Sequence, residues 1–347
     1  MSKHLVLTAP RQLDYEETVD PPLKAGEVRV RTLFSGISAG TEMTIYRGTN
    51  VYMHKRWDAD RHLFLPGEGP SWNYPIPNLG YEEVGEVVEL ARDVDDIVPG
   101  TNVYGTWNHR STAVIPVDYA RQRRMPPGAE PIFGIFSHIG AVALNGVHDS
   151  HVRIGDTVAV FGMGVLGQIV AQAAIRSGAR VIGIDLYDYR LQVAREHGVW
   201  AGLNPRKDKV AEAIKDLTSG RGADVCIEVS GSIQALNEAI RSVAYSSRLV
   251  AMGLFQGDAS GLILGDEFHH NRVNLVCSQI SGVAPDIQHR WNKPRLWATA
   301  VQLQADGLLD LKSLISHTAD FDQAASLFET LDKAPEQVMQ AVITFPQ

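Results

Sequence analysis

The chain has 347 residues, and its 40 acidic and 32 basic side chains give a formal charge of −8. This length predicts roughly two domains of about 150 residues each, with enough hydrophobic residues for a sizeable core. The negative charge argues against nucleic acid or an anionic membrane as a partner, and the two cysteines, Cys226 and Cys277, exclude a disulfide scaffold and a four-thiolate zinc lobe.

Segments that would direct the chain into or across a membrane are not expected. The first residues carry no apolar run of signal-peptide length, and no uninterrupted apolar stretch of about 18 residues occurs. We therefore predict a soluble, cytoplasmic protein without a membrane partner.

Residues 1–125 have the pattern of short strands and turns. Residues 28–33 and 84–90 alternate between apolar and polar side chains, as half-buried strands do. The stretch 49–77 is instead polar, contains prolines and is rich in aromatic residues, which predicts a long surface excursion. Its aromatic side chains, Trp57 and Trp72 among them, either form a lid or substrate wall or simply pack the loop.

From residue 126 the pattern changes to alternating strands and helices. A helix is expected over 131–146, and strands over 157–161, 181–185, 224–229, 248–252 and 275–278, most of them separated by helices. Such alternation predicts a parallel sheet covered by helices on both faces. After residue 284 we expect helices over 295–305 and 322–331 and a last strand over 340–345.

The strongest motif is the glycine-rich segment Gly162-Met-Gly164-Val-Leu-Gly167, which follows an apolar strand and opens an apolar helix. In a dinucleotide fingerprint the first glycine makes a tight turn, the second lets the pyrophosphate approach, and the third lets the helix pack on the strand. The amide groups at Val165 and Leu166 would then face the phosphates at the helix N-terminus.

An acidic residue completes this fingerprint. Asp185 ends the next strand at the expected spacing of about 20 residues. Its carboxylate can accept hydrogen bonds from the ribose hydroxyls and would repel a 2′-phosphate, so we predict NAD rather than NADP as the cofactor. Arg190 either flanks the adenine or lies on the surface of the next helix.

Further motifs resemble the medium-chain dehydrogenase/reductase superfamily, in its zinc alcohol and polyol dehydrogenase branch, over nearly the whole chain. These motifs lie at residues 26–30, at Ser35-Gly-Ile-Ser-Ala-Gly-Thr-Glu42, at Gly80-Tyr-Glu-Glu-Val-Gly85, at residues 98–103 and at residues 155–158.

The resemblance implies an α/β fold with a Rossmann doubly wound parallel sheet and a GroES-like β-barrel domain. It implies a GroES-like catalytic domain over 1–125, a Rossmann NAD-binding domain over 126–283, and a segment 284–347 that completes the catalytic domain. In such enzymes substrate and nicotinamide meet between the domains. A homodimer or homotetramer is the family expectation.

The residues that hold zinc in this family are altered here. Where the family has its first catalytic cysteine, this chain has Ala39, or Ser38 if one residue is inserted, and Tyr81 stands where the family has histidine. His138 stands where the family has its third ligand, and the structural zinc lobe is missing. We therefore predict no metal, with residual zinc binding through Glu82 and His138 as an open alternative.

Without zinc, a side chain must take the proton when an alcohol is oxidised. His138 is one candidate, because the ordinary histidine pKa lies near 6.5. Tyr81 is the other, and Glu82 would orient or charge-balance either of them. Thr41 matches the hydroxyl that passes the proton on in the family, while the family's relay histidine is Thr44 here.

Other polar and aromatic side chains are weaker candidates for substrate contacts. His109 precedes a strand that lines the substrate cleft in the family, and Trp57 and Trp72 lie in the aromatic excursion. The adjacent His269 and His270 point in different directions on any regular element, so we expect them to be structural.

These observations predict a zinc-independent, NAD-dependent dehydrogenase that interconverts a secondary alcohol and a ketone, with a small polyol, cyclitol or sugar-like substrate. Two alternatives stay open: a quinone or enoyl reductase of the same superfamily, and an NAD(H)-binding protein without catalysis. The turn at residues 35–42 also resembles that of the hydroxyethyl-bacteriochlorophyllide dehydrogenase branch, so a bulky substrate stays open too.

Overall fold

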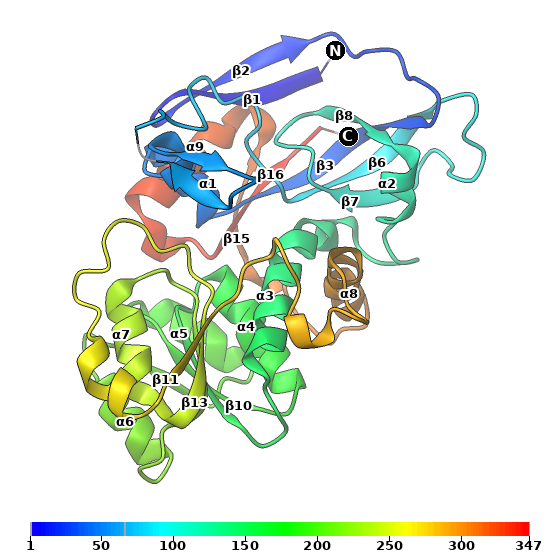
Figure 1. The fold of residues 1–347 in the computed structure, drawn as a ribbon. Coiled ribbons are helices and arrows are strands. Elements are labelled where there is room, and N and C mark those ends of the chain that lie inside the picture. Colours follow the sequence, from blue (N-terminus) through cyan, green and yellow to red (C-terminus); the bar gives the residue numbers. More distant parts are fainter. Residues whose placement is uncertain (1, 66, 347) are drawn as a thin grey trace. The chain divides into compact units, whose positions relative to one another are not determined.

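The computed structural model describes residues 2–65 and 67–346, which form two compact units (Figure 1). Unit 1 comprises the chain up to His138 together with the chain from Lys312 onward. Unit 2 is Ile139–Leu311. The chain therefore passes from one unit to the other later than the expected positions after residues 125 and 283.

Unit 2 alternates strands and helices, as the sequence pattern predicts. Its strands are β9 (Thr157–Phe161), β10 (Arg180–Ile184), β11 (Ala201–Leu203), β12 (Ala223–Glu228), β13 (Val243–Ala251) and β14 (Asn274–Cys277). Its helices are α3 (Phe136–Ser150, which begins in unit 1), α4 (Val165–Arg176), α5 (Asp188–Glu196), α6 (Val210–Leu217), α7 (Ile233–Ser242) and α8 (Lys293–Ala305). A π-helical turn covers Leu264–Phe268, and a 3₁₀ turn covers Pro285–Ile287.

The sheet of unit 2 has the order β11–β10–β9–β12–β13–β14, and all neighbouring strands run parallel. Every residue of the central strand β9 is buried. Ala159 and Phe161 face the apolar cluster that includes α6 and α7, while Val160 lies on the side of α4. Helices thus cover both faces, and the strand order is that of the doubly wound dinucleotide-binding fold, which confirms the predicted Rossmann domain.

Unit 1 is built mainly from strands. They are β1 (Ser2–Ala9), β2 (Gln12–Thr18), β3 (Glu27–Ile37), β4 (Arg56–Asp58), β5 (Leu63–Leu65), β6 (Glu83–Leu90), β7 (Asn102–Gly105), β8 (Thr112–Pro116), β15 (Ile315–Asp320) and β16 (Gln340–Thr344). Its helices are α1 (Thr41–Arg47), α2 (Val117–Arg121) and α9 (Ala324–Lys333). The 3₁₀ turns are Val51–Met53, Pro131–Ile135, Lys312–Leu314, Phe321–Gln323 and Pro335–Gln337.

The larger sheet of unit 1 contains strands from both ends of the chain. Its order is β15–β16–β3–β6–β7, and β8 also pairs with β3. The C-terminal strand β16 runs antiparallel to β3, from Ala341 opposite Ile37 to Thr344 opposite Phe34. The last segment therefore completes the first domain, as the GroES-like fold requires.

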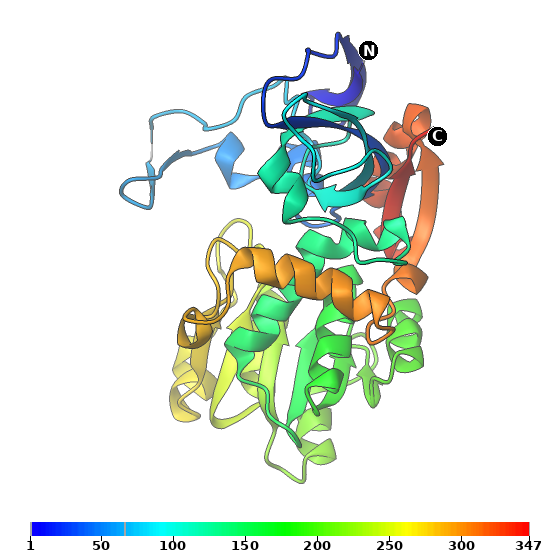
Figure 2. The ribbon, with the colours of Figure 1, turned by 90° about the vertical axis from the view of Figure 1, so that its right-hand side faces the viewer.

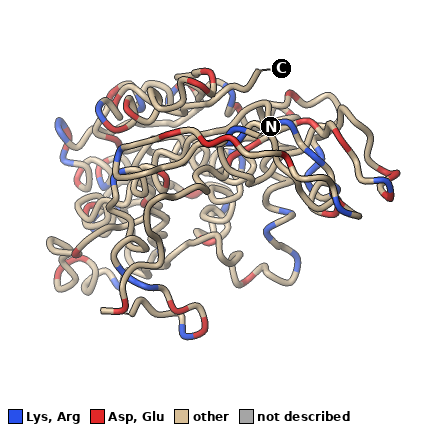
Figure 3. The backbone as a smooth tube through the Cα atoms, turned by 90° about the horizontal axis from the view of Figure 1, so that it is seen from above, with Lys and Arg blue, Asp and Glu red and all other residues tan. Residues whose placement is uncertain are grey.

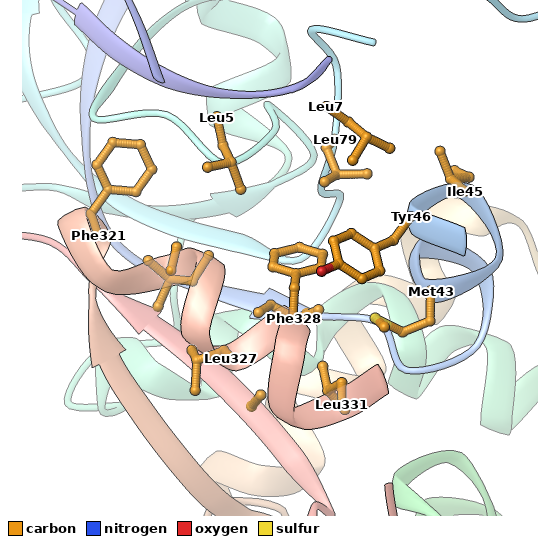
Figure 4. Packing of buried hydrophobic residues seen from close by; sticks show 14 of the residues in the cluster. Leu5, Leu7, Met43, Ile45, Tyr46, Leu79, Phe321, Leu327, Phe328 and Leu331 are labelled. Carbon is orange, nitrogen blue, oxygen red and sulfur yellow. The ribbon is translucent and has the colours of Figure 1, made fainter. Parts of the chain in front are cut away.

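An apolar cluster fixes the C-terminal helix in unit 1. Phe328 of α9 lies against Tyr46 of α1, and Leu331 lies on the side of Met43, while Leu327 belongs to the same cluster (Figure 4). Leu5 and Leu7 of β1 complete the cluster. Since a buried Leu or Phe contributes roughly 1.5–3 kcal/mol, this cluster stabilises the attachment of the C-terminal segment strongly.

The two passages between the units follow local contacts. The 3₁₀ turn Pro131–Ile135 packs on β3, β6 and β7, which places it in unit 1. The segment after α8 is tied to α4, because Gln172 donates to the carbonyl of Asp310 and Arg176 to that of Leu308.

The aromatic excursion folds on itself. The hairpin β4–β5 carries Trp57 and Phe64, whose ring centroids lie 4.8 Å apart. Tyr52 stacks on Trp72 at 4.6 Å and contacts Phe64 at 5.3 Å. In Figure 2 this blue-to-cyan segment extends away from the strands of unit 1. Its aromatic side chains pack on one another and keep exposed surface, 38% in the case of Trp72.

The two cysteines differ in exposure. Cys226 is buried on β12, but Cys277 is exposed. Cys277 lies on β14, the edge strand of its sheet, where three of the four residues are exposed.

Charge is spread along the chain. Figure 3 shows basic and acidic residues interspersed along the tube. Within the described ranges, no helix combines the length and apolar character needed to cross a membrane.

Candidate functional site

The glycine-rich turn of unit 2 has the close contacts that a dinucleotide fingerprint needs. Gly162 follows β9 with φ of +97°, and a Cβ there would come within 2.9 Å of Ser230. A Cβ at Gly167 would lie 1.8 Å from the carbonyl oxygen of Gly162. Both positions therefore require glycine for the turn itself.

Gly164 differs from the other two glycines of the motif, Gly162 and Gly167, in having open space beside it. A Cβ at this position would have the Arg190 guanidinium, 3.7 Å away, as its nearest neighbour among the described residues. Gly164 precedes the first turn of α4, where the amides of Val165, Leu166 and Gly167 have no intrahelical acceptor. This open side can hold a pyrophosphate against the helix N-terminus.

Asp185 lies at the end of β10 beside this turn. Its carboxylate accepts hydrogen bonds from the backbone amides of Met163 (2.7 Å) and Tyr187 (2.9 Å). Arg190 on α5 lies 3.8 Å from the same carboxylate, and its guanidinium faces the ring of Tyr187. The structure thus brings Gly164, Asp185 and Arg190 together at the carboxyl ends of the strands, where nucleotides bind in this fold.

In unit 1 the candidates for proton transfer form a small group. The hydroxyl of Tyr81 donates to Ser38 Oγ at 2.5 Å. The ring of His138, at the start of α3, meets the Tyr81 ring edge-on with centroids 5.1 Å apart. Burial and then the charges of Glu82 and Glu42 raise the pKa of the Tyr81 hydroxyl, which the hydroxyls of Ser38 and Thr41 partly oppose. Tyr81 is therefore a hydrogen-bond donor at neutral pH and a poor base.

Behind this group lies a fully buried ion pair. His109 Nε2 donates to Glu42 Oε2 at 2.8 Å, and neither side chain has exposed surface. His109 Nδ1 lies 2.7 Å from Ser35 Oγ, which in turn donates to Glu83 Oε1. When Glu83 is ionised, the Ser35 hydroxyl donates to it and His109 Nδ1 donates to Ser35, so the ring is an imidazolium in that state.

The pKa directions agree with this assignment. Burial lowers the pKa of His109, but the charge of Glu42, its hydrogen bond and the charge of Glu83 raise it above the usual value. Burial raises the pKa of Glu83 to about 7, although the charge of His109 opposes the rise.

Glu82 is a different kind of carboxyl. It is completely buried, and among the described residues the Gln340 side chain is the hydrogen-bonding group that acts to lower its pKa. Burial, followed by the charges of Glu42 and Glu83, raises its pKa well above its usual range. The protonated form is therefore favoured, and Glu82 does not supply a ready negative charge to its neighbours.

One prediction about substrate contacts is wrong. Both ring nitrogens of the fully buried His109 are bonded within unit 1, so it has no donor for a substrate. Trp57 and Trp72 pack on Phe64 and Tyr52 inside the excursion, and their role as substrate contacts stays a prediction. Thr41 is half-buried at the start of α1.

The side chains at the family's zinc positions do not fit zinc. Ser38 and Tyr81 are hydroxyls bonded to each other, and Tyr81 is held in its neutral form. In the parts of the chain that the structure describes, no three histidine, cysteine or acidic side chains are placed to hold a metal ion. Zinc prefers thiolate, imidazole and carboxylate ligands, so this donor set is a poor one.

The sequence pattern missed Ser35, Ser38, Glu42 and Glu83 as members of one network. A signal was present, because Glu83 and Ser35 are polar residues on strands that are otherwise largely apolar inside. Their pairing with His109 depends on tertiary contacts between β3, β6, α1 and the segment before β8.

Comparisons with known proteins fit this geometry. A family model described as zinc-binding dehydrogenase matches residues 165–293. A D-guloside 3-dehydrogenase of Escherichia coli K12 is 33% identical over 99% of this chain and 100% of its own length. The chain belongs to the medium-chain dehydrogenase/reductase superfamily.

Solved structures of this superfamily share the fold. A zinc-binding dehydrogenase from Sinorhizobium meliloti bound to NADP has a TM-score of 0.80 at 21% identity, with 99% of both chains covered. An alcohol dehydrogenase from E. coli CFT073 with NADH has a TM-score of 0.78 at 21% identity, again with 99% of both chains covered. The predicted fold and the prediction of a dehydrogenase of the alcohol and polyol type are confirmed.

The two glycines of the turn should respond differently to alanine. Gly167→Ala should destabilise the protein by about 1–3 kcal/mol, because its methyl group would overlap the carbonyl of Gly162. Gly164→Ala should leave the urea midpoint unchanged and weaken nicotinamide dinucleotide binding at least about tenfold, because the methyl group would occupy the space for the pyrophosphate. Urea unfolding and fluorescence titration with NADH measure both. Unchanged NADH affinity in Gly164→Ala would contradict the site.

The buried carboxyl of Glu83 should make stability depend on pH. Its pKa is near 4.5 in an unfolded chain and about 7 when folded. Stability from its protonated form is therefore fully present below about pH 4.5 and is lost as the pH rises through about 7. Relative to Glu83→Gln, the wild type should lose stability between pH 5 and pH 8, as measured by urea midpoints. Glu89→Gln, at an exposed position on the same strand, is the control. If the difference in stability between the wild type and Glu83→Gln does not change with pH, the raised pKa of Glu83 is contradicted.

Proposed function

We propose that this protein is a zinc-independent, NAD-dependent dehydrogenase that oxidises a secondary alcohol of a polyol or sugar-like substrate to a ketone. The observation that carries the proposal is the contact of Tyr81 with Ser38 and His138, at positions where the family holds zinc. The relatedness to a D-guloside 3-dehydrogenase supports a sugar-like substrate with vicinal hydroxyl groups. The cytoplasmic location and the homodimeric or homotetrameric state stay predictions.

In the proposed reaction His138 takes the proton of the substrate hydroxyl. Histidine is the usual side chain for this work near neutral pH. Tyr81 is held protonated and donates its one hydroxyl proton to Ser38 Oγ, so the Ser38 hydroxyl is left to donate a hydrogen bond to the substrate oxygen and orient it, while Thr41 adds a further hydroxyl close to Tyr81. Glu82, favoured in its neutral form, limits the negative charge near the alkoxide that forms.

NAD is the proposed cofactor, and when bound it accepts the hydride from the alcohol carbon. Asp185 supports this choice, because its carboxylate stands at the end of β10 where a ribose would lie. Arg190, 3.8 Å from that carboxylate, partly offsets its charge. We therefore propose a preference for NAD that depends on Asp185.

An activity screen on metal-free protein tests the reaction. Protein dialysed against a chelator should reduce NAD⁺ with polyols, cyclitols or glycosides at an undiminished rate, and with NADP⁺ more slowly. Asp185→Ala should narrow the gap between the two cofactors. Absorbance at 340 nm and metal analysis are the measurements. One tightly bound zinc per chain, with activity lost on chelation, would overturn the proposed mechanism.

Variants of the acid–base pair test the assignment of roles. His138→Ala should lower kcat about 10²-fold or more, because the hydroxyl proton loses its acceptor. Tyr81→Phe should lower kcat about tenfold and leave the pH profile of kcat unchanged in shape, because the raised pKa of Tyr81 keeps it protonated throughout. His148→Ala, on the same helix as His138, is the control. Wild-type rates in His138→Ala would remove histidine as the base.

A further inference from the structure

We propose that His109 and Glu42 form a positioning pair that holds the Ser38–Tyr81 hydroxyl pair in place for the acid–base step. The inference rests on the proposed function for its kinetic consequences, but its structural content stands on contacts within unit 1. Neither member of the pair is exposed, so neither touches substrate, and both act through other residues.

The first connection between the His109–Glu42 pair and the Ser38–Tyr81 pair runs through Glu42. Its carboxylate bridges two elements, because Oε2 accepts from His109 Nε2 and Oε1 accepts from the backbone amide of Ser38 at 3.0 Å. Ser38 follows β3, and its side-chain oxygen accepts the hydroxyl of Tyr81. Glu42 therefore fixes the backbone that presents Ser38 Oγ.

The second connection runs through the backbone before Tyr81. The amide of His109 donates to the carbonyl of Leu79 at 2.8 Å, and Asn108 Nδ2 donates to the carbonyl of Gly80 at 2.8 Å. Gly80 has φ of +99°, and a Cβ there would lie 2.7 Å from the imidazole ring. The segment that leads into Tyr81 is thus pressed directly against His109.

The two connections close a ring of contacts. Starting at Tyr81, the ring passes through Ser38, Glu42 and His109 and returns through Gly80 to Tyr81. A closed ring of hydrogen bonds and packing contacts constrains the position of the Tyr81 hydroxyl more tightly than either connection alone. Positions of catalytic hydroxyls matter because a displacement of about 1 Å can cost about 10²-fold in rate.

All the groups that face His109 support this role. Glu42 and Ser35 bind its two nitrogens, Glu83 lies behind Ser35, and Phe328 meets the ring edge-on at 5.9 Å. The ring is therefore held on every described side, with no freedom to act as a mobile proton carrier. The backbone amide of Ser38, which carries no transferable proton, is the link to Glu42, and this also favours positioning over proton transfer.

A matched pair of substitutions at His109 separates the effect of its hydrogen bond to Glu42 from the effect of its contact with Ser35. Glutamine places an amide N–H near the position of Nε2, so His109→Gln keeps a donor for Glu42. Asparagine places its amide near the position of Nδ1, so His109→Asn keeps a partner for Ser35 and loses Glu42. In crystals, the Tyr81–Ser38 hydrogen bond should be lost in His109→Asn and retained in His109→Gln.

The rates of the two variants should differ in the same way as their Tyr81–Ser38 hydrogen bonds. His109→Asn should lower kcat for polyol oxidation about 10²-fold, and His109→Gln should stay within about threefold of the wild type. KM for NAD⁺ should be unchanged in both, because the fingerprint glycines and Asp185 lie in unit 2. A general loss of structure would instead change the two variants together.

The outcomes are distinct. An intact Tyr81–Ser38 bond in His109→Asn, or equal loss in both variants, overturns the positioning pair. If His109→Asn does not fold, Glu42→Gln gives the same test. The oxygen of the glutamine amide can still accept a hydrogen bond from His109, but its NH₂ group then faces the backbone N–H of Ser38, so the hydrogen bond to Ser38 is lost. A wild type that oxidises no polyol with NAD⁺ would reject the proposed function, while the crystallographic comparison would still decide the positioning role.

Discussion

A charged imidazole without exposed surface exists in unit 1 because acidic side chains face it on two sides. Moving an ion out of water costs several kcal/mol even after the protein relaxes, and only close partners with good geometry offset that cost. His109 has them in Glu42, at 2.8 Å, and in Ser35, which leads to Glu83. The chain segments that supply these partners also carry Ser38 and Tyr81, so the ion pair and the candidate site are built from the same elements.

The fold was largely predictable because its signals are local. The strand before Gly162, the helix after Gly167 and Asp185 at the end of the next strand lie within one stretch of sequence, and each has a mechanical reason. The GroES-like domain was recognisable from turns such as Gly80–Gly85. The boundaries near residues 138 and 311 depend on how turns pack and were not visible in the pattern.

The candidate site was predictable only in part. Tyr81, His138 and Thr41 followed from the positions where the family binds zinc or passes the proton, and the structure brings the Tyr81 ring against His138. The network behind them was not predictable, because β3, β6 and α1 meet only in the folded chain. His109 was for this reason mistaken for a substrate contact, since burial and pairing cannot be seen in a single motif.

The acidic side chains around this site also support the role that we propose for Tyr81, which is to help orient the substrate and not to act as the base. Three carboxyls, those of Glu42, Glu82 and Glu83, are fully buried together, and one imidazolium cannot balance three ionised groups. Protonation of Glu82 relieves this excess, as its raised pKa indicates. The same field works against an ionised Tyr81, because a phenolate beside Glu42 would add another buried negative charge. In the zinc-free reaction that we propose, a proton acceptor that becomes positive when it takes the proton offsets this negative charge. Histidine meets that condition, and tyrosine does not.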